Sequence, residues 1–262
     1  MLEGKVAIVS GAAQGLGEAF ARKLAQEGAD VLAFDVKDTV ADVAKKIAAE
    51  TGRKVVGMKA DVSKRSDVEK VVAKAVEMGG VDILVNNAGT HRKTPVDSSW
   101  EQAVADWDFI MDTNFKGVLM LSRACVPHMK EKGGDIVNIS TYYVLPARSD
   151  GTNQPDTDLY NASKWALNGF TDSWSKSLEE FGIRVNALCM GATDTPMLRG
   201  IFPNGEYPAD FAKLVMKPEQ IAQQMIDLFK DGRTGENIGA WVGYPVEVGP
   251  RKAPNKRISG VA

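Results

Sequence analysis

Val6-Ala7-Ile8-Val9-Ser10-Gly11-Ala12-Ala13-Gln14-Gly15-Leu16-Gly17 is an apolar run followed at once by three closely spaced glycines. Four consecutive apolar residues suit a strand that is buried on both faces. The glycines permit a tight turn, and beyond them Phe20, Leu24 and Ala25 recur at helical spacing. The sequence therefore predicts a strand, a turn and a helix, which is the beginning of a β-α-β unit.

Short apolar runs continue to alternate with longer stretches of helical period along the chain. The longest such stretch, residues 100–129, is either one helix or a broken pair. This alternation is typical of an α/β protein, and we expect a doubly wound parallel sheet with helices on both faces, the Rossmann fold. No repeat or linker divides residues 1–262, so a single domain is predicted. The predicted strands are residues 6–9, 31–34, 55–58, 81–85, 136–139 and 185–188.

The composition excludes several classes of partner and site. Lys and Arg number 32 against 34 Asp and Glu, a net charge of −2, so cations are not in excess for binding nucleic acid. Neither a signal peptide nor an apolar run of ~20 residues is seen, so we expect a cytoplasmic protein with no membrane partner. Cys125 and Cys189 lie in apolar stretches and are predicted to be buried thiols of a reducing compartment. With His91 and His128 as the two histidines, no metal site is expected.

The glycine turn has the spacing G-x3-G-x-G, and two interpretations of it remain open. Without side chains, Gly11 and Gly15 would let backbone N–H groups approach a pyrophosphate, which the helix dipole would also attract. Gln14 and Leu16 would lie against the same cofactor, and Gly17 would let the helix pack closely on the strand. Alternatively, the glycines serve only the steric demands of a tight turn.

Asp35 ends the second predicted strand, 18 positions beyond Gly17. A carboxylate near that spacing accepts hydrogen bonds from the adenosine ribose in dinucleotide-binding folds. It would repel a 2′-phosphate, and neither Gln14 nor Val36 supplies a cation for one. Lys37 is interpreted as a surface residue. NAD is therefore predicted as the cofactor, rather than NADP.

Two further groups follow predicted strands. Asp61 and Val62 either contact the adenine ring or mark the start of a helix, and the sequence leaves both open. Asn87, Ala88 and Gly89 follow the fourth strand, where an amide can tie loops together and a glycine lets the backbone pass close to a ribose. We expect structural and cofactor-binding roles to coexist there.

Tyr160 and Lys164 are four residues apart in a stretch of helical period, so their side chains share one face. A nearby ammonium and a positively charged nicotinamide would both favour the phenolate, which makes Tyr160 a candidate general base. On these two residues alone, an ordinary surface pair is the alternative. Ser140 ends the fifth predicted strand at the same edge of the sheet, where its hydroxyl could hold a substrate oxygen beside Tyr160.

The glycine turn, Asn86-Asn87-Ala88-Gly89, Ser140 and Tyr160-x3-Lys164 together resemble the short-chain dehydrogenase/reductase family over nearly the whole chain. The resemblance implies a tetrad in which Tyr160 is the general acid/base and Ser140 orients the substrate oxygen. It implies that Lys164 binds ribose hydroxyls and lowers the pKa of Tyr160, and that Asn114 holds a proton-relay water. By itself, Asn114 could be a polar residue that satisfies helix backbone.

The chain departs from the family after the sixth strand, where Met190-Gly191 stands in place of the usual Pro-Gly. Gly191 can still turn beneath the nicotinamide, and Met190 could shape the pocket. In the family comparison, Thr193 and Thr195 fall at cofactor-binding positions, with Thr195 expected to bond the carboxamide.

Two polar loops follow strands at the carboxyl edge and are predicted to border the substrate: residues 141–159 and 191–217. Tyr142 and Tyr143 are the candidates for substrate contact in the first loop. Arg148 and Arg199 could grip a carboxylate, a sulfonate or sugar hydroxyls. In the ordinary interpretation, these two arginines are solvated or paired with nearby aspartates.

We therefore expect an NAD-dependent oxidoreductase that interconverts a hydroxyl and a carbonyl on a small polar substrate, such as a sugar, polyol or hydroxy acid. The alternatives are a dehydrogenase of apolar secondary alcohols or cyclic diols, a sugar-nucleotide epimerase, and a sensor that binds NAD(H) without turnover.

A homo-oligomer is expected as well, and the family resemblance implies a tetramer. The helical stretches 100–129 and 160–181 carry more apolar side chains than one sheet face requires. These side chains are Phe109, Ile110, Met111, Trp165, Phe170 and Trp174. The basic tail, residues 239–262, could cross to a neighbouring subunit or be solvated.

Overall fold

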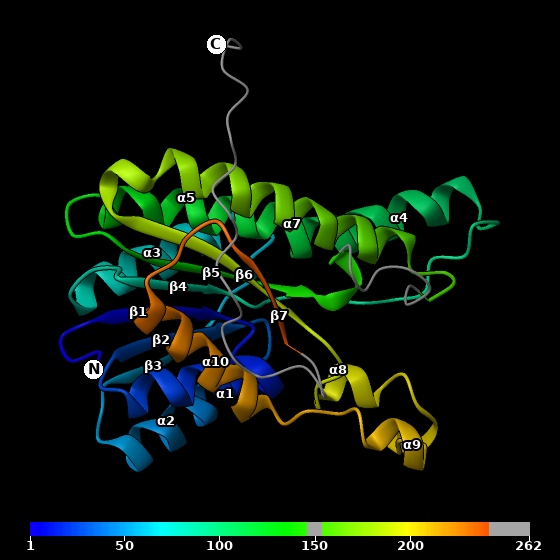
Figure 1. The fold of residues 1–262 in the computed structure, drawn as a ribbon, viewed down its shortest axis with the longest axis horizontal. Helices are drawn as coiled ribbons and strands as arrows, with labels where there is room; N and C mark the ends of the chain where they lie inside the picture. The colour runs from blue at the N-terminus through cyan, green and yellow to red at the C-terminus, as the bar shows by residue number, and fades with distance from the viewer. Residues whose placement is uncertain (146–153, 241–262) are drawn as a thin grey trace, which may run out of the picture.

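The computed structural model describes residues 1–145 and 154–240 (Figure 1). Its strands are β1 (Val6–Ser10), β2 (Asp30–Asp35), β3 (Val55–Lys59), β4 (Ile83–Asn86), β5 (Gly134–Thr141), β6 (Ile183–Met190) and β7 (Asn237–Ala240). They form one parallel sheet in the order β3-β2-β1-β4-β5-β6-β7. The strand order reverses between β1 and β4, so a crevice opens at their carboxyl ends. The predicted doubly wound sheet is confirmed.

All six predicted strands are present, and β7 is a seventh that the sequence did not indicate. It has four residues and pairs with β6, from Ala187 opposite Asn237 to Met190 opposite Ala240. Such a short segment containing Asn and Gly has no clear strand period. Its hydrogen bonds with β6 make it a strand, and this pairing is a tertiary contact.

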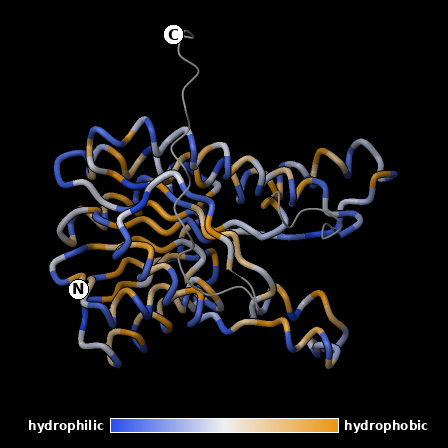
Figure 2. The backbone as a smooth tube through the Cα atoms, viewed as in Figure 1, coloured by the Kyte–Doolittle hydropathy of each residue, from blue (hydrophilic) through white to orange (hydrophobic). Residues whose placement is uncertain are grey.

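Helices cover both faces of the sheet, as predicted (Figure 1). One face holds α1 (Gly15–Gln26), α2 (Val40–Thr51) and α10 (Pro218–Asp231), and the other holds α3 (Arg65–Met78), α5 (Gly117–Met129) and α7 (Asp158–Ser177). Phe20 and Leu24 of α1 are fully buried, in agreement with the face expected from their spacing. Hydrophobic residues concentrate along the central strands in Figure 2, and this buried core holds the strand ends in place.

The stretch from Trp100 to Met129 is one helical run with an irregular centre. It consists of α4 (Trp100–Met111), a π-turn (Asp112–Lys116) and α5. A π-turn inside a helix often marks a functional site, because the extra residue redirects a side chain. Here the turn contains the predicted site residue Asn114, which is completely buried.

Short helices form much of what the sequence suggested was loop. They are a 3-10 turn (Tyr142–Val144), α8 (Pro196–Arg199), another 3-10 turn (Pro203–Gly205) and α9 (Ala209–Ala212), while a further 3-10 turn (Glu179–Phe181) follows α7 at the end of the predicted helical stretch 160–181. In Figure 1, α8 and α9 extend beyond the sheet on the same side as α4. Arg148 and all but the first two residues of the 239–262 tail lie outside the described residues.

Cys125 and Cys189 are both buried, as predicted, and they do not form a disulfide with each other. Within residues 1–145 and 154–240, no helix is long and apolar enough to span a membrane. The same ranges contain no cluster of His, Cys, Asp and Glu side chains that could hold a metal ion.

Candidate active site

A cavity of about 1090 Å³ opens at the carboxyl ends of the strands. Nearly all of the predicted site residues in the described ranges line it. They are Gly11, Gln14, Gly15, Leu16, Asp35, Asp61, Val62, Asn87, Ala88, Gly89, Ser140, Tyr142, Tyr143, Tyr160, Lys164, Met190, Gly191, Thr193 and Thr195. Three others, Gly17, Asn114 and Arg199, are not part of its wall.

The glycine turn forms one end of the cavity, and it needs glycine for two different reasons. Gly11 and Gly15 have φ angles of +65° and +58°, a region that side chains disfavour. Gly17 is required for space, since a Cβ there would lie 2.0 Å from the Gly11 carbonyl oxygen and 2.6 Å from Nδ2 of Asn87. The open backbone at the start of α1 is therefore a suitable cradle for a pyrophosphate.

Asn87 ties this turn to the end of β4. Its Nδ2 donates to the carbonyl oxygens of Ser10 at 2.9 Å and Gly11 at 3.1 Å. In return, the Ser10 hydroxyl accepts hydrogen bonds from the backbone N–H groups of Asn87 and Ala88, both at 2.9 Å. The two strand ends beside the crevice are thus locked together, in line with the expected structural role of this segment.

Asp35 lies at the end of β2, and both of its carboxylate oxygens accept backbone hydrogen bonds at 3.0 Å, one from Ala13 and one from Lys37. These bonds orient the carboxylate beside the glycine turn. The Lys37 side chain is exposed, as expected, yet its ammonium reaches across the turn to Oε1 of Gln14 at 2.8 Å and it lines the cavity. The cavity therefore has a cation near Asp35 that the sequence spacing did not indicate.

Asp61 lies just before a helix and also in the wall of the cavity, and its contact with an adenine ring stays a prediction. Its Oδ1 accepts hydrogen bonds from the backbone N–H and the hydroxyl of Ser63, at 3.0 and 2.7 Å, just before α3 begins. Burial alone would raise the pKa of Asp61, but the Ser63 hydrogen bonds hold it below its usual value. Asp61 and Val62 also line the cavity, so the start of a helix and the wall of the pocket coincide.

Ser140, Tyr160 and Lys164 converge on the central wall of the cavity. The Ser140 hydroxyl is buried and has no hydrogen-bond partner among the described residues. Lys164 lies one turn beyond Tyr160 on α7, with its ammonium 5.7 Å from the centroid of the phenol ring. The ammonium donates a 2.8 Å hydrogen bond to the carbonyl oxygen of Ile139. This buried arrangement is not the ordinary surface pair.

Burial shifts the pKa values of both titratable groups on this wall. It raises the pKa of Tyr160 to about 12, an effect that a hydrogen bond with Thr141 partly opposes. It lowers the pKa of Lys164 to about 8. At neutral pH the phenol is therefore protonated and ready to donate a proton, and it needs added positive charge nearby before it can accept one.

Asn114 binds the loop after β4 to α7 and does not bond to its own helix. Its Oδ1 accepts from the backbone N–H of Thr90 at 2.7 Å, and its Nδ2 donates to the Thr90 carbonyl oxygen at 3.0 Å and to the Ser163 hydroxyl at 3.1 Å. The Ser163 hydroxyl donates in turn to the carbonyl oxygen of Tyr160 at 2.7 Å. The helix-backbone alternative is therefore wrong, and a role for Asn114 in holding a relay water stays a prediction.

The residues after β6 also meet the cofactor end of the cavity. The Gly191 N–H donates to the Ala240 carbonyl oxygen at 2.7 Å, so β7 anchors the turn that lacks the usual proline. Thr195 caps α8 by accepting from the N–H of Leu198 at 3.2 Å, and the Thr193 hydroxyl donates to the Gly191 carbonyl oxygen at 3.1 Å.

The structure separates the predicted substrate residues. Tyr142 and Tyr143 lie together in the cavity wall with ring centroids 4.6 Å apart, and burial raises the pKa of Tyr143. Arg199 instead forms two bonds with the Asp194 carboxylate, at 2.6 and 2.8 Å, and a third with the Gly205 carbonyl oxygen at 3.2 Å. Its guanidinium braces the α8 segment, which agrees with the ordinary interpretation of a paired arginine.

The sequence reasoning missed two features of the pocket. His91 lines the cavity and meets Tyr160 edge-on, with ring centroids 4.9 Å apart. Its position two residues after Gly89, just beyond a strand end, was the available signal. Five apolar side chains, here called the outer wall, also line the cavity: Phe109, Met197, Leu198, Ile201 and Phe211.

Comparisons with known proteins agree with this geometry. The family model described as short chain dehydrogenase matches residues 5–205. A 3-oxoacyl-acyl-carrier-protein reductase of Thermotoga maritima is 36% identical over 247 residues, covering 91% of this chain and 96% of that protein.

Two solved structures are similar, each at 30% identity and each covering 91% of this chain and 97% of the other. One is a 3-ketoacyl-acyl-carrier-protein reductase from Brucella melitensis complexed with NADH, with a TM-score of 0.75. The second is a short chain dehydrogenase from Burkholderia cenocepacia in complex with NADP, with a TM-score of 0.79. With its parallel sheet, its glycine turn and the Ser140, Tyr160 and Lys164 wall, the chain belongs to the short-chain dehydrogenase/reductase family of oxidoreductases.

Proposed function

We propose that this oxidoreductase uses NAD to interconvert a hydroxyl and a carbonyl group on a small, polar, uncharged substrate. The observation that carries the proposal is the convergence of Ser140, Tyr160 and Lys164 on one cavity wall, beside a glycine cradle suited to a dinucleotide. The buried Ser140 hydroxyl, which lacks a partner in the described part of the chain, suits a site that receives a substrate oxygen.

A bound nicotinamide cofactor supplies the hydride acceptor or donor for this chemistry. Tyr160 takes the hydroxyl proton when the substrate is oxidised and returns it to the oxygen when a carbonyl is reduced. Ser140 donates a hydrogen bond to the same oxygen and so orients it. The Lys164 ammonium favours ionisation of Tyr160, while Asn114 holds the Thr90 backbone and α7 in register.

An anionic substrate was expected because Arg148 and Arg199 could bind it. Arg199 is instead paired with Asp194 and is not part of the cavity wall, so it does not favour an anion. The other arginine, Arg148, lies outside the described residues. Asp108, Asp112 and Asp156 line the cavity together with Lys93, and Lys116 pairs with Asp112 at 3.1 Å. This mixture of charges favours an uncharged substrate over an anionic one.

A second candidate is reduction of a 3-oxoacyl group, the activity for which two of the similar proteins are named. The apolar outer wall, which includes Leu198, Ile201 and Phe211, suits an acyl chain. Both candidates share the same proton transfer at Tyr160 and differ in what occupies the outer wall.

One assay separates the candidates. Secondary alcohols, polyols, sugars and the corresponding ketones are tested with NAD(H) and NADP(H), together with acetoacetyl-coenzyme A as a 3-oxoacyl probe, by following absorbance of the reduced cofactor. The proposal predicts that an uncharged alcohol or ketone gives the highest kcat/KM. Dominant activity on the thioester would favour the second candidate, and absence of turnover with every compound would favour a sensor.

NAD should give a kcat/KM at least ~10-fold higher than NADP, because the Asp35 carboxylate, held beside the glycine turn, would repel a 2′-phosphate on the adenosine ribose. The opposing group is Lys37, whose ammonium lies 2.8 Å from Oε1 of Gln14. We therefore expect Lys37→Ala to lower residual NADP use while NAD use changes little. Equal or better use of NADP by the wild-type enzyme would show that Lys37 outweighs Asp35.

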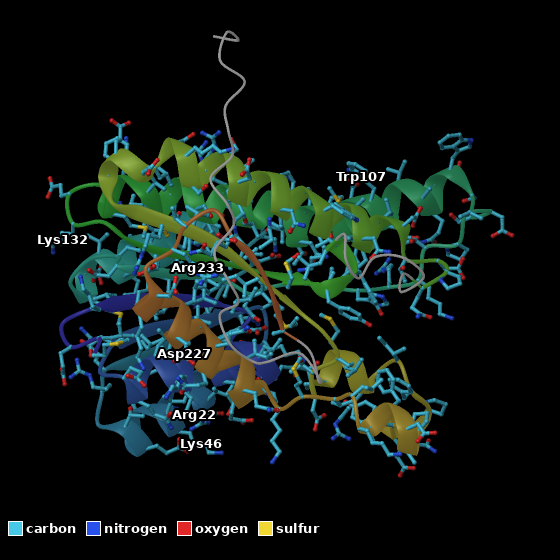
Figure 3. The ribbon with its side chains drawn as sticks, viewed as in Figure 1. Arg22, Lys46, Trp107, Lys132, Asp227 and Arg233 are labelled. Atoms are coloured by element: carbon cyan, nitrogen blue, oxygen red, sulfur yellow. The ribbon has the colours of Figure 1, made fainter. Side chains whose placement is uncertain are left out.

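The protein should form a homo-oligomer, with a tetramer expected. Trp100, Trp107 and Trp165 of α4 and α7 are 85%, 51% and 43% exposed, and Figure 3 shows Trp107 on the side of α4 away from the sheet. Ile110 and Phe170 are instead buried within this chain, so that part of the expected surface was wrong. Light scattering at micromolar concentration measures the mass, and a monomer would contradict the prediction.

A further inference from the structure

His91 is a half-buried polar residue that the proposed mechanism does not use. It lines the cavity, and its ring meets the ring of Tyr160 at an angle of 73° with centroids 4.9 Å apart. Among the described residues, none forms a hydrogen bond with its ring nitrogens. A polar ring in this position, on the wall where the substrate oxygen is held, is suited to contact the substrate.

The backbone leading into His91 is firmly held. The preceding residue, Thr90, has both its N–H and its carbonyl oxygen bonded to the Asn114 side chain, at 2.7 and 3.0 Å. Asn114 is itself completely buried and bonded to Ser163 of α7. His91 is therefore presented to Tyr160 by the same network that fixes α7, which is the preorganisation expected of a binding group.

The charge state of His91 points to a neutral contact. Burial lowers the pKa of His91, so at neutral pH its imidazole offers one N–H donor and one nitrogen acceptor. A carboxylate would find little support here, because Lys93 is exposed and shares the cavity lining with Asp108, Asp112 and Asp156. A hydroxyl can bond to either nitrogen of the neutral ring, and a carbonyl oxygen can accept from its N–H.

We propose that the substrate carries a second uncharged oxygen on the carbon next to the reacting one, and that His91 forms a hydrogen bond with it. The two rings are in direct contact, with centroids 4.9 Å apart, so the imidazole is close to the phenol that binds the reacting oxygen, and we place the two substrate oxygens on adjacent carbons. The substrate class is then a vicinal diol, or the α-hydroxy ketone formed from it. This inference rests on the proposed alcohol and carbonyl chemistry and specifies its substrate.

The test compares matched substrates that differ in the second oxygen. Butane-2,3-diol is paired with butan-2-ol and cyclohexane-1,2-diol with cyclohexanol, each stereoisomer is assayed separately with NAD, and lactate serves as the charged probe. The variants are His91→Phe, which keeps an aromatic ring against Tyr160, and His91→Asn, which keeps a hydrogen-bonding group. His128→Phe makes the same change at the exposed histidine of α5 and serves as the matched control. NADH titration by fluorescence confirms that each variant is folded.

The wild-type enzyme should prefer each diol over its mono-alcohol by at least ~10-fold in kcat/KM, since a site that bonds a hydroxyl discriminates against the analogue that lacks it. His91→Phe should reduce that ratio by about 10-fold or more, mainly through KM for the diol, and His91→Asn should restore part of it. His128→Phe should leave the ratio unchanged.

Three results would overturn the inference while leaving the proposed function intact. They are equal use of diols and mono-alcohols by the wild type, a preference for lactate, and an equal loss on both members of each pair in His91→Phe. The last result would mean that His91 only packs against Tyr160. Absence of turnover with every alcohol and ketone would instead reject the proposed function itself, and the inference with it.

Discussion

Replacing Tyr160 by phenylalanine should lower kcat by about 100-fold or more while NADH binding stays nearly intact. The substitution removes the phenolic oxygen that exchanges a proton with the substrate, and it keeps the ring that packs against His91. The glycine turn and Asp35, which form the cofactor end of the cavity, are unchanged. Steady-state kinetics and fluorescence titration with NADH measure the two effects separately.

The pH dependence of the wild-type enzyme provides a further check on this assignment. Burial raises the pKa of Tyr160 to about 12, so the protonated phenol predominates at neutral pH in the free enzyme. Oxidation needs the ionised form, so its rate should rise as the pH increases, whereas reduction uses the protonated form and should fall at alkaline pH. Both trends should be lost in Tyr160→Phe.

Tyr207→Phe is a suitable control, since Tyr207 bonds to Asp194 and is not part of the cavity wall. Its kinetics should remain close to those of the wild type. Near-native turnover in Tyr160→Phe would remove this residue from the mechanism. Another group beside Ser140 and Lys164 would then have to exchange the proton with the substrate.

Gly17→Ala should cause a large loss of both stability and cofactor binding. A Cβ at this position would lie 2.0 Å from the Gly11 carbonyl oxygen, and that carbonyl cannot swing aside freely because Asn87 bonds to it at 3.1 Å. The start of α1 must therefore move away from the turn. We expect the free energy of unfolding to fall by about 2 kcal/mol or more, as in overpacked cores, and NADH affinity to fall by about 10-fold.

The chain offers a matched control for this change. Gly169 lies within α7, one turn beyond Trp165, is exposed, and within the single chain would have no neighbour within 4 Å of an added Cβ. Gly169→Ala should therefore stabilise the protein by about 0.5 to 1 kcal/mol, because alanine is the better helix former. Chemical denaturation measures both variants. A Gly17→Ala protein with normal stability and normal NADH affinity would mean that the turn tolerates the side chain.

The sequence alone predicted the parts of this protein that depend on near neighbours in the chain. The alternation of apolar runs and helical faces indicated the layered sheet, and the four-residue spacing placed Tyr160 and Lys164 on one face of α7. Strand ends then identified Ser140 and Asp35, because parallel strands bring their carboxyl ends to the same edge. These features follow from periodicity and from rules of sheet connection, which short segments express by themselves.

Tertiary structure alone decided which side chains from distant segments meet. Arg199 could have faced the substrate, but Asp194 and Gly205 hold it elsewhere. Lys37 reaches Gln14 across the glycine turn, β7 exists because β6 pairs with it, and His91 meets Tyr160 from a loop 69 positions earlier in the chain. Contacts of this kind depend on the packed positions of whole elements, and no local pattern of residues encodes them.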